Sequence, residues 1–295
     1  MKTIKILFLV FLIVLLFIIA LILYYSEDII HWLIYNLGMV PIEGTTTKST
    51  VDNRSLLNMN VKHLEGDDYK ILLLIDKKIN IDKAKDVPLS IFFHGNGMNI
   101  YDDFMAWGWI SDRYKINCAF IETPGRNGVK RKFTKRNLMI ILEKSINVLK
   151  EMNFNITNVT GFSLGTAVAS IVACEYNIPV LTLLAPFCNF KDIAYTYVPN
   201  ISCIKNKVSR VCTKDFNFNT LKLLENYKGK VNLFHGEKDS IILPENSIKI
   251  HKKIKQRRVG ESKQCIIFKN TDHGMILDPR NVEVISNLVY FNRSI

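Results

Sequence analysis

The sequence of 295 residues lacks the signatures of several large classes of protein. No His and Cys residues have the spacing of a metal site, and the chain contains neither a P-loop nor a G-x-G-x-x-G fingerprint. No segment recurs with the period of about 20–50 residues that is typical of solenoids. We therefore expect a protein without a metal ion or another cofactor, and we exclude a repeat architecture.

Acidic residues are scarce relative to basic ones, which gives the chain a net charge of +12. The basic residues gather in two runs, at 126–136 and 252–258. No zinc-finger spacing or other nucleic-acid-binding signature accompanies these runs, so we expect no nucleic-acid partner. We interpret them as solvated helix faces, and the alternative is contact with an anionic lipid surface.

Apolar residues make up 48% of the chain, which is enough to bury one large core. The first apolar stretch, residues 6–26, contains no charged side chain. About 20 helical residues cross a hydrocarbon layer of about 30 Å, whereas a cleavable signal peptide has an apolar region of only about 7–15 residues. We therefore predict an uncleaved transmembrane signal anchor over residues 1–26.

The charges on either side of this stretch predict its orientation. Lys2 and Lys5 precede it, and Glu27 and Asp28 follow it. Because positively charged flanks prefer the cytoplasm, we predict a single-pass protein with a cytosolic N-terminus and a lumenal or extracellular domain. Six cysteines would allow disulfides in that compartment. N-x-S/T sequons, which also arise by chance in an Asn-rich chain, begin at Asn53, Asn155, Asn158, Asn200 and Asn292.

Short apolar runs alternate with longer helical patterns in the rest of the chain. The runs are rich in β-branched and aromatic residues, so we predict strands over 71–76, 89–94, 118–122, 158–162, 180–184, 231–235 and 265–268. We predict helices over 134–152, 164–176, 245–256 and 280–291. This alternation indicates an α/β fold whose mainly parallel central sheet has helices on both faces.

One segment, residues 187–228, interrupts the alternation and is rich in aromatic side chains. We interpret it as a cap insertion that packs over the C-terminal edge of the sheet. The chain is thereby divided into the anchor at 1–26, a juxtamembrane segment and linker at 27–55, and a single domain at 56–295.

The strongest local signal is the pentapeptide Gly161-Phe162-Ser163-Leu164-Gly165, which lies between a predicted strand and a predicted helix. A nucleophile on a sharp strand-to-helix turn needs small residues two positions before and two positions after it. The turn exposes the Ser163 hydroxyl at a helix N-terminus, where the N–H of Leu164 can point at a developing oxyanion. We predict that Ser163 is the nucleophile and that Leu164 is one oxyanion donor.

A glycine-rich turn, His94-Gly95-Asn96-Gly97, directly follows another predicted strand. Glycines in such a turn allow backbone N–H groups to approach a substrate closely. We assign the second oxyanion donor to the N–H of Asn96, with that of Gly97 as the alternative. For His94 we favour a hydrogen-bonded core histidine over a general base.

An acid and a base follow the last two predicted strands, in the sequences HGEKD at 235–239 and TDHG at 271–274. Because the carboxyl ends of parallel strands meet at one edge of the sheet, we expect both residues to lie at the same edge as Ser163. We predict that His273 takes the proton of Ser163 and passes it to the leaving group. Asp239 would fix the imidazole tautomer and stabilise the imidazolium.

Two other carboxylates compete with Asp239 for the role of the acid. Glu237 precedes the favoured position at the strand end. Asp272 adjoins His273, whose ring it could not easily orient from the next residue. We interpret both as loop or capping carboxylates.

Four motifs together resemble the membrane-anchored α/β-hydrolase domain-containing proteins: HGNG at 94–97, GFSLGTAVA at 161–169, HGEKDSIILP at 235–244 and DHG at 272–274. The resemblance covers residues 87–290 and implies the α/β-hydrolase fold, with HGEKDSIILP as the acid loop. It also implies action on lipid esters, monoacylglycerols, lysophospholipids or S-acylated proteins. The turn TPGRNG at 123–128 departs from the R-G-Y-G-type turn of many relatives.

Three functions agree with these observations. We favour hydrolysis of a carboxylic ester or thioester, in a lipid-like substrate that the aromatic cap and the anchor would accommodate. The same triad would serve an acyltransferase, in which an alcohol takes the acyl group. A catalytically idle binding protein with this fold is the third hypothesis, although every required residue type is present in order.

Overall fold

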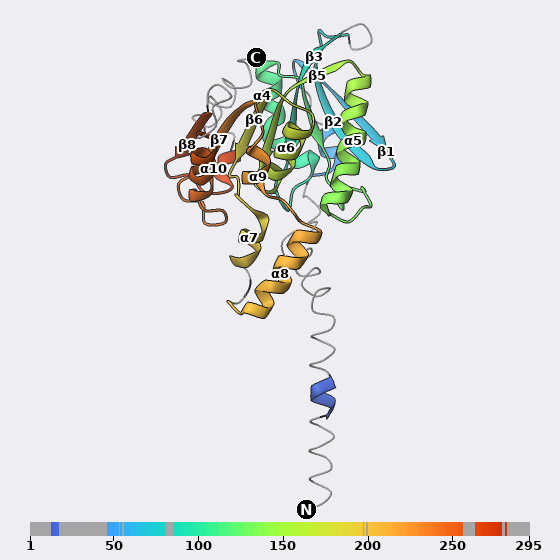
Figure 1. The fold of residues 1–295 in the computed structure, drawn as a ribbon. Coiled ribbons are helices and arrows are strands. Elements are labelled where there is room, and N and C mark those ends of the chain that lie inside the picture. Colours follow the sequence, from blue (N-terminus) through green and yellow to red (C-terminus); the bar gives the residue numbers. More distant parts are fainter. Residues whose placement is uncertain are drawn as a thin grey trace, which may run out of the picture.

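The computed structural model describes residues 13–17, 46–52, 54, 56–80, 85–196, 198, 200–255, 263–278 and 281 (Figure 1). Most of the predicted anchor and much of the linker lie outside the described residues, as does the helix predicted over 280–291 apart from residue 281. Among the residues that are described, no helix combines the length and the apolar character that crossing a bilayer requires.

One eight-stranded sheet, in the order β1-β2-β4-β3-β5-β6-β7-β8, forms the centre of the protein. Its strands are β1 (Met59–Gly66), β2 (Tyr69–Asp76), β3 (Val87–Phe93), β4 (Cys118–Ile121), β5 (Phe154–Phe162), β6 (Val180–Leu184), β7 (Lys230–Gly236) and β8 (Lys263–Phe268). β1 pairs with β2 and β2 pairs with β4 in antiparallel fashion, whereas the pairs from β4 to β8 are parallel. The predicted, mainly parallel sheet is therefore confirmed.

The helices are α3 (Lys48–Asp52), α4 (Ile100–Tyr114), α5 (Lys135–Glu151), α6 (Leu164–Glu175), α7 (Phe190–Thr196), α8 (Ser202–Lys214), α9 (Thr220–Leu224) and α10 (Glu245–Lys255). A 3₁₀ turn, η2 (Met275–Leu277), follows β8. α5, α6 and α10 match predicted helices. α4 was not predicted, although Asn99 and Asp102 form a capping box at its start.

The helices cover both faces of the sheet (Figure 1). Leu73 and Ile91 face one apolar cluster, which includes the buried sides of α5, α6 and α10. Leu72, Phe92 and Phe120 face the other, which α4 and η2 complete. Because strand side chains alternate between faces, strands that are buried on both sides are apolar at almost every position. This is why the central strands were predictable.

Residues 187–228, between β6 and β7, contain α7, α8 and α9. Figure 1 shows α7 and α8 projecting from the body of the domain. A bridge between Asn189 and Asn219 closes the base of the segment, and the N–H of Phe190 donates to the carbonyl oxygen of Phe218 at 2.9 Å. Phe216 packs against Phe190 with ring centroids 5.7 Å apart. An aromatic cluster thus connects the projecting helices to the domain.

All six cysteines are free thiols in this structure. Cys118 and Cys188 are buried, whereas Cys203 is exposed near the start of α8. The domain is held together by its apolar clusters rather than by cross-links between cysteines.

Candidate active site

Ser163 lies on the turn that joins β5 to α6, with a φ of 52° and a ψ of −117° that L-residues rarely adopt. Close packing of two glycines accompanies this conformation. A Cβ on Gly161 would lie 2.2 Å from the carbonyl oxygen of Gly165, and a Cβ on Gly165 would lie 2.2 Å from the carbonyl oxygen of Phe93. Real Cβ atoms do not approach so closely, so both positions require glycine.

The imidazole of His273 joins Ser163 to Asp239. Its Nε2 lies 3.0 Å from the Oγ of Ser163, and its Nδ1 lies 2.6 Å from the Oδ2 of Asp239. When Nδ1–H donates to the carboxylate, Nε2 is left to accept the hydroxyl proton of Ser163. The three residues follow β5, β7 and β8, whose carboxyl ends meet at one edge of the sheet. The structure therefore brings together all three residues that the sequence singled out for this chemistry.

Asp239 is buried and is held by several donors. Its Oδ1 accepts the N–H groups of Ile241 at 3.0 Å and Ile242 at 2.9 Å, and the Nε2 of His235 lies 3.1 Å from its Oδ2. Burial alone would raise the pKa of this carboxyl, but hydrogen bonds from His235, His273 and Ile242 lower it well below its usual range. Asp239 is therefore ionised at neutral pH, as an acid that orients an imidazole requires.

His235 was not assigned a role from the sequence, although the strand-end motif HG contains it. Its Nδ1 lies 2.7 Å from the Oγ of Ser247 in α10, and its Nε2 lies 2.7 Å from the carbonyl oxygen of Ile242. Because a carbonyl can only accept, Nε2 carries a proton. That N–H also faces Asp239, so His235 contacts two residues of the loop after β7 and fixes its conformation.

The two competing carboxylates have other partners. Glu237 accepts the N–H of Asn270 at 3.3 Å, and Asp272 accepts the N–H of Met275 at 2.8 Å at the start of η2. Both are loop or capping carboxylates, as predicted. Within the part of the chain that the structure describes, no group of three His, Cys, Asp or Glu residues could hold a metal ion.

The predicted oxyanion donors belong to two segments that adjoin Ser163. Leu164 is the first residue of α6, where a backbone N–H has no acceptor within the helix. Asn96 lies in the loop between β3 and α4, which we call the oxyanion loop (residues 94–99). A Cβ on Gly95 would lie 3.3 Å from the Cβ of Ser163, so this loop runs directly against Ser163.

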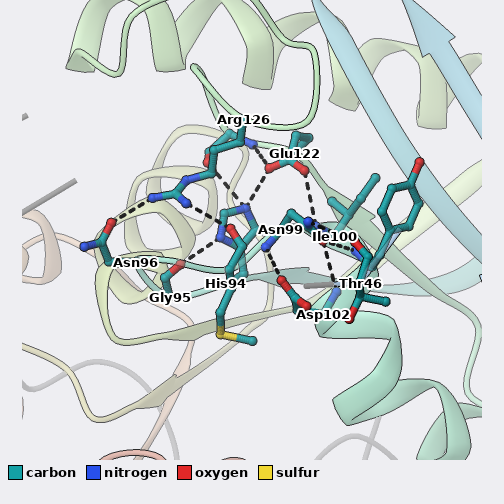
Figure 2. A network of polar contacts seen from close by, with 12 residues as sticks. Thr46, His94, Gly95, Asn96, Asn99, Ile100, Asp102, Glu122 and Arg126 are labelled. Atoms are coloured by element: carbon teal, nitrogen blue, oxygen red, sulfur yellow. Dashed lines mark hydrogen bonds and ion pairs between the residues drawn. The ribbon is translucent and has the colours of Figure 1, made fainter. Parts of the chain in front are cut away.

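His94 and Glu122 form a buried pair beneath the oxyanion loop (Figure 2). The Nε2 of His94 lies 2.8 Å from the Oε1 of Glu122, and its Nδ1 lies 2.9 Å from the carbonyl oxygen of Gly95. Burial opposes both charges, but their mutual attraction and hydrogen bond leave the pKa of His94 raised and that of Glu122 lowered. His94 is thus a hydrogen-bonded core histidine, as predicted, and it forms an ion pair with Glu122.

Asp103, on α4, is a third buried ionisable group near this pair. Its Oδ2 has no hydrogen-bond partner among the described residues. Burial raises the pKa of this carboxyl to about 8, which the positive charge of His94 only partly offsets. At pH 7 this raised pKa favours the protonated, neutral form of Asp103.

Known proteins resemble this chain in sequence and fold. No protein-family model matches it. A curated protein of Acanthamoeba polyphaga mimivirus, named as an alpha/beta hydrolase, is 27% identical over 210 residues, which are 68% of this chain and 73% of that protein. An esterase structure from Pyrococcus furiosus has a TM-score of 0.59 at 15% identity and covers 85% of this chain and 96% of its own. An acylaminoacyl peptidase structure from Pyrococcus horikoshii has a TM-score of 0.60 at 13% identity and covers 83% of this chain and 43% of its own. The chain has the α/β-hydrolase fold.

The burial of Asp103 predicts an unusual dependence of stability on pH. The pKa of this carboxyl rises from its ordinary value of 3.8 to about 8 on folding, so the folded state keeps a proton that the unfolded state loses between these values. The free energy of unfolding therefore falls as pH rises through this window. We expect Asp103→Asn, which cannot ionise, to gain stability relative to the wild type from about pH 5 to about pH 8.

Denaturant unfolding at several pH values measures this difference. Asp67→Asn, in the exposed turn between β1 and β2, is the matched control and should follow the wild type throughout. Parallel curves of stability against pH for Asp103→Asn and the wild type would contradict the expectation.

Proposed function

We propose that this chain, an enzyme of the α/β-hydrolase family, is a serine hydrolase that cleaves carboxylic ester or thioester bonds in a lipid-like substrate. The observation that carries the proposal is the hydrogen-bonded series Ser163–His273–Asp239, with distances of 3.0 and 2.6 Å. The nucleophile also occupies the strained strand-to-helix turn that exposes a hydroxyl at a helix N-terminus.

The first half of the proposed reaction acylates Ser163. Its Oγ attacks the carbonyl carbon while its proton passes to the Nε2 of His273. The negative charge that develops on the carbonyl oxygen is stabilised by the N–H groups of Leu164 and Asn96. The imidazolium is stabilised by Asp239 and gives its proton to the departing alcohol or thiol, which leaves an acyl-Ser163 ester.

The second half repeats these steps with water. His273 removes a proton from a water molecule, and the resulting hydroxide adds to the acyl carbon. The carboxylic acid departs as Ser163 regains its proton from His273. Acyl transfer would follow the same route with an alcohol in place of water. The two reactions differ in their products, which the substrate panel described below identifies.

Apolar side chains near the triad support a lipid-like substrate. Ile241 and Leu243, in the loop that carries Asp239, are 53% and 57% exposed, and Met275, two residues after His273, is 44% exposed. Large apolar side chains at a site are suited to contact with an acyl chain. The aromatic segment at 187–228 and the apolar N-terminal stretch agree with such a substrate.

We also propose that residues 1–26 anchor the chain in a membrane with the catalytic domain on the lumenal or extracellular side. The length of the apolar run at 6–26 and the positive charges before it support this topology. The basic surface, with a net charge of +12 over the chain, would favour contact with anionic lipid head groups.

Glycosylation of the expressed protein tests this topology. Asn155 and Asn200 are exposed, whereas Asn158 is fully buried in β5 and cannot accept a glycan in the folded domain. In eukaryotic microsomes we expect a glycosidase-sensitive shift in mobility that Asn155→Gln with Asn200→Gln reduces and Asn158→Gln leaves unchanged. An unglycosylated domain that added protease digests on intact microsomes would overturn the topology.

Labelling with a fluorophosphonate probe tests the nucleophile. We expect Ser163→Ala to abolish labelling and to lower ester hydrolysis by on the order of 10⁴-fold or more, because the covalent route is lost. Ser49→Ala, at an exposed position in α3, is the matched control and should label like the wild type.

A panel of lipid esters and thioesters, with and without added acceptor alcohols, then identifies the products. Free acid as the product supports hydrolysis, and a new ester supports acyl transfer. Labelling of Ser163→Ala at the same stoichiometry as the wild type would contradict the assignment of Ser163.

A further inference from the structure

Arg126 is a buried cation in the turn after β4 and is only 4% exposed. Its Nη2 donates to the Oδ1 of Asn96 at 2.7 Å, and its Nη1 donates to the carbonyl oxygen of Met98 at 3.1 Å (Figure 2). These two acceptors lie on either side of Gly97. A planar guanidinium suits such a two-point contact, because its donors are held in a fixed fork.

The oxyanion loop needs a constraint of this kind. Gly95 and Gly97 give it conformational freedom, and Gly97 adopts a φ of 75°. A backbone donor stabilises an oxyanion only when it is already oriented toward it. Movement of Asn96 would therefore weaken the stabilisation of the transition state without changing the triad.

Other contacts hold the two ends of the same loop. At the start, His94 pairs with Glu122 at 2.8 Å. At the end, the N–H of Ile100 donates to the Oε2 of Glu122 at 3.2 Å, and Asn99 caps α4. Glu122 thus fixes both ends, while Arg126 contacts the middle, where the predicted donor lies.

The charges beneath the loop add a second effect. Because His94 and Glu122 form an ion pair with each other, the guanidinium of Arg126 places a further positive charge directly against the oxyanion loop. A positive charge in a water-poor region favours the negative charge that develops beside it during acyl transfer.

We propose that Arg126 is a positioning residue for the hydrolase reaction: it fixes Asn96 across Gly97 and so holds the oxyanion loop ready for the transition state. The inference rests on the proposed function. Arg126 belongs to the turn TPGRNG at 123–128, so the loop is fixed by a contact from a separate segment of the chain.

Steady-state kinetics with a short-chain ester measure the consequence. Loss of one direct oxyanion donor lowers kcat by about 10²–10³-fold in other hydrolases. We expect a smaller loss in kcat, about 10- to 100-fold, for Arg126→Gln, with KM little changed. Arg126→Lys should recover part of the loss, because an ammonium keeps the charge but not the fork.

Arg131→Gln is the matched control. Arg131 lies in the same connection between β4 and α5, and its guanidinium also makes a two-point contact, to Asp68 at 2.8 and 3.1 Å, away from the oxyanion loop. We expect this variant to keep the wild-type kcat. Thermal stability is measured for each variant, because a loss of activity that comes only from weakened folding would be accompanied by a lower melting temperature.

Asn96→Ala removes the acceptor of the Arg126 hydrogen bond but keeps the backbone N–H. It tests the same contact from the other side if Arg126→Gln fails to fold. The double variant should be no slower than the slower single variant, because both changes break one interaction.

Amide hydrogen exchange over residues 94–100 provides a readout that is independent of activity. We expect faster exchange in Arg126→Gln than in Arg131→Gln. Unchanged exchange, or a wild-type kcat in Arg126→Gln, would overturn the inference. If the wild type shows no Ser163-dependent hydrolysis, the proposed function fails, and the exchange comparison still decides whether Arg126 fixes the loop.

Discussion

The close approach of two backbone segments is the constraint on which the site depends. Gly165, in the first turn of α6, packs against the carbonyl oxygen of Phe93, at the end of β3. This contact places the oxyanion loop beside Ser163 and leaves no room for a side chain on Gly165. The strained backbone of Ser163 persists because the sheet and α6 enclose it, and strain of this kind is typical of functional turns. The position of each donor and acceptor follows from that packing.

Around this contact, the polar groups of the site form two supported units. Asp239 is held by backbone N–H groups and by His235, and it in turn orients His273. The oxyanion loop is held by Glu122 and Arg126. Each group that would touch a substrate is therefore positioned by a buried group behind it, which is how a preorganised site limits rearrangement during the reaction.

The fold and the arrangement of Ser163, Asp239 and His273 could be predicted from the sequence because their signals are local. Central strands are buried on both faces, and the residues around Ser163 lie within one pentapeptide. β1 was missed because it is an edge strand whose residues Lys62, His63 and Glu65 interrupt any apolar pattern. The contacts of His94 with Glu122 and of Arg126 with Asn96 join residues 28 and 30 positions apart, so no local pattern indicates them. His235 was recognised as part of a motif, but its contact with Asp239 required the geometry of the loop.

Detection of the acyl-enzyme tests the central claim most directly. The protein is mixed with an ester substrate, quenched in acid during turnover and digested for peptide mass spectrometry. We expect a mass increase equal to the acyl group, located on Ser163, and its accumulation should increase when deacylation is slowed. Turnover with no adduct on Ser163, or with the acyl group on another nucleophile such as the exposed Cys203, would contradict the account.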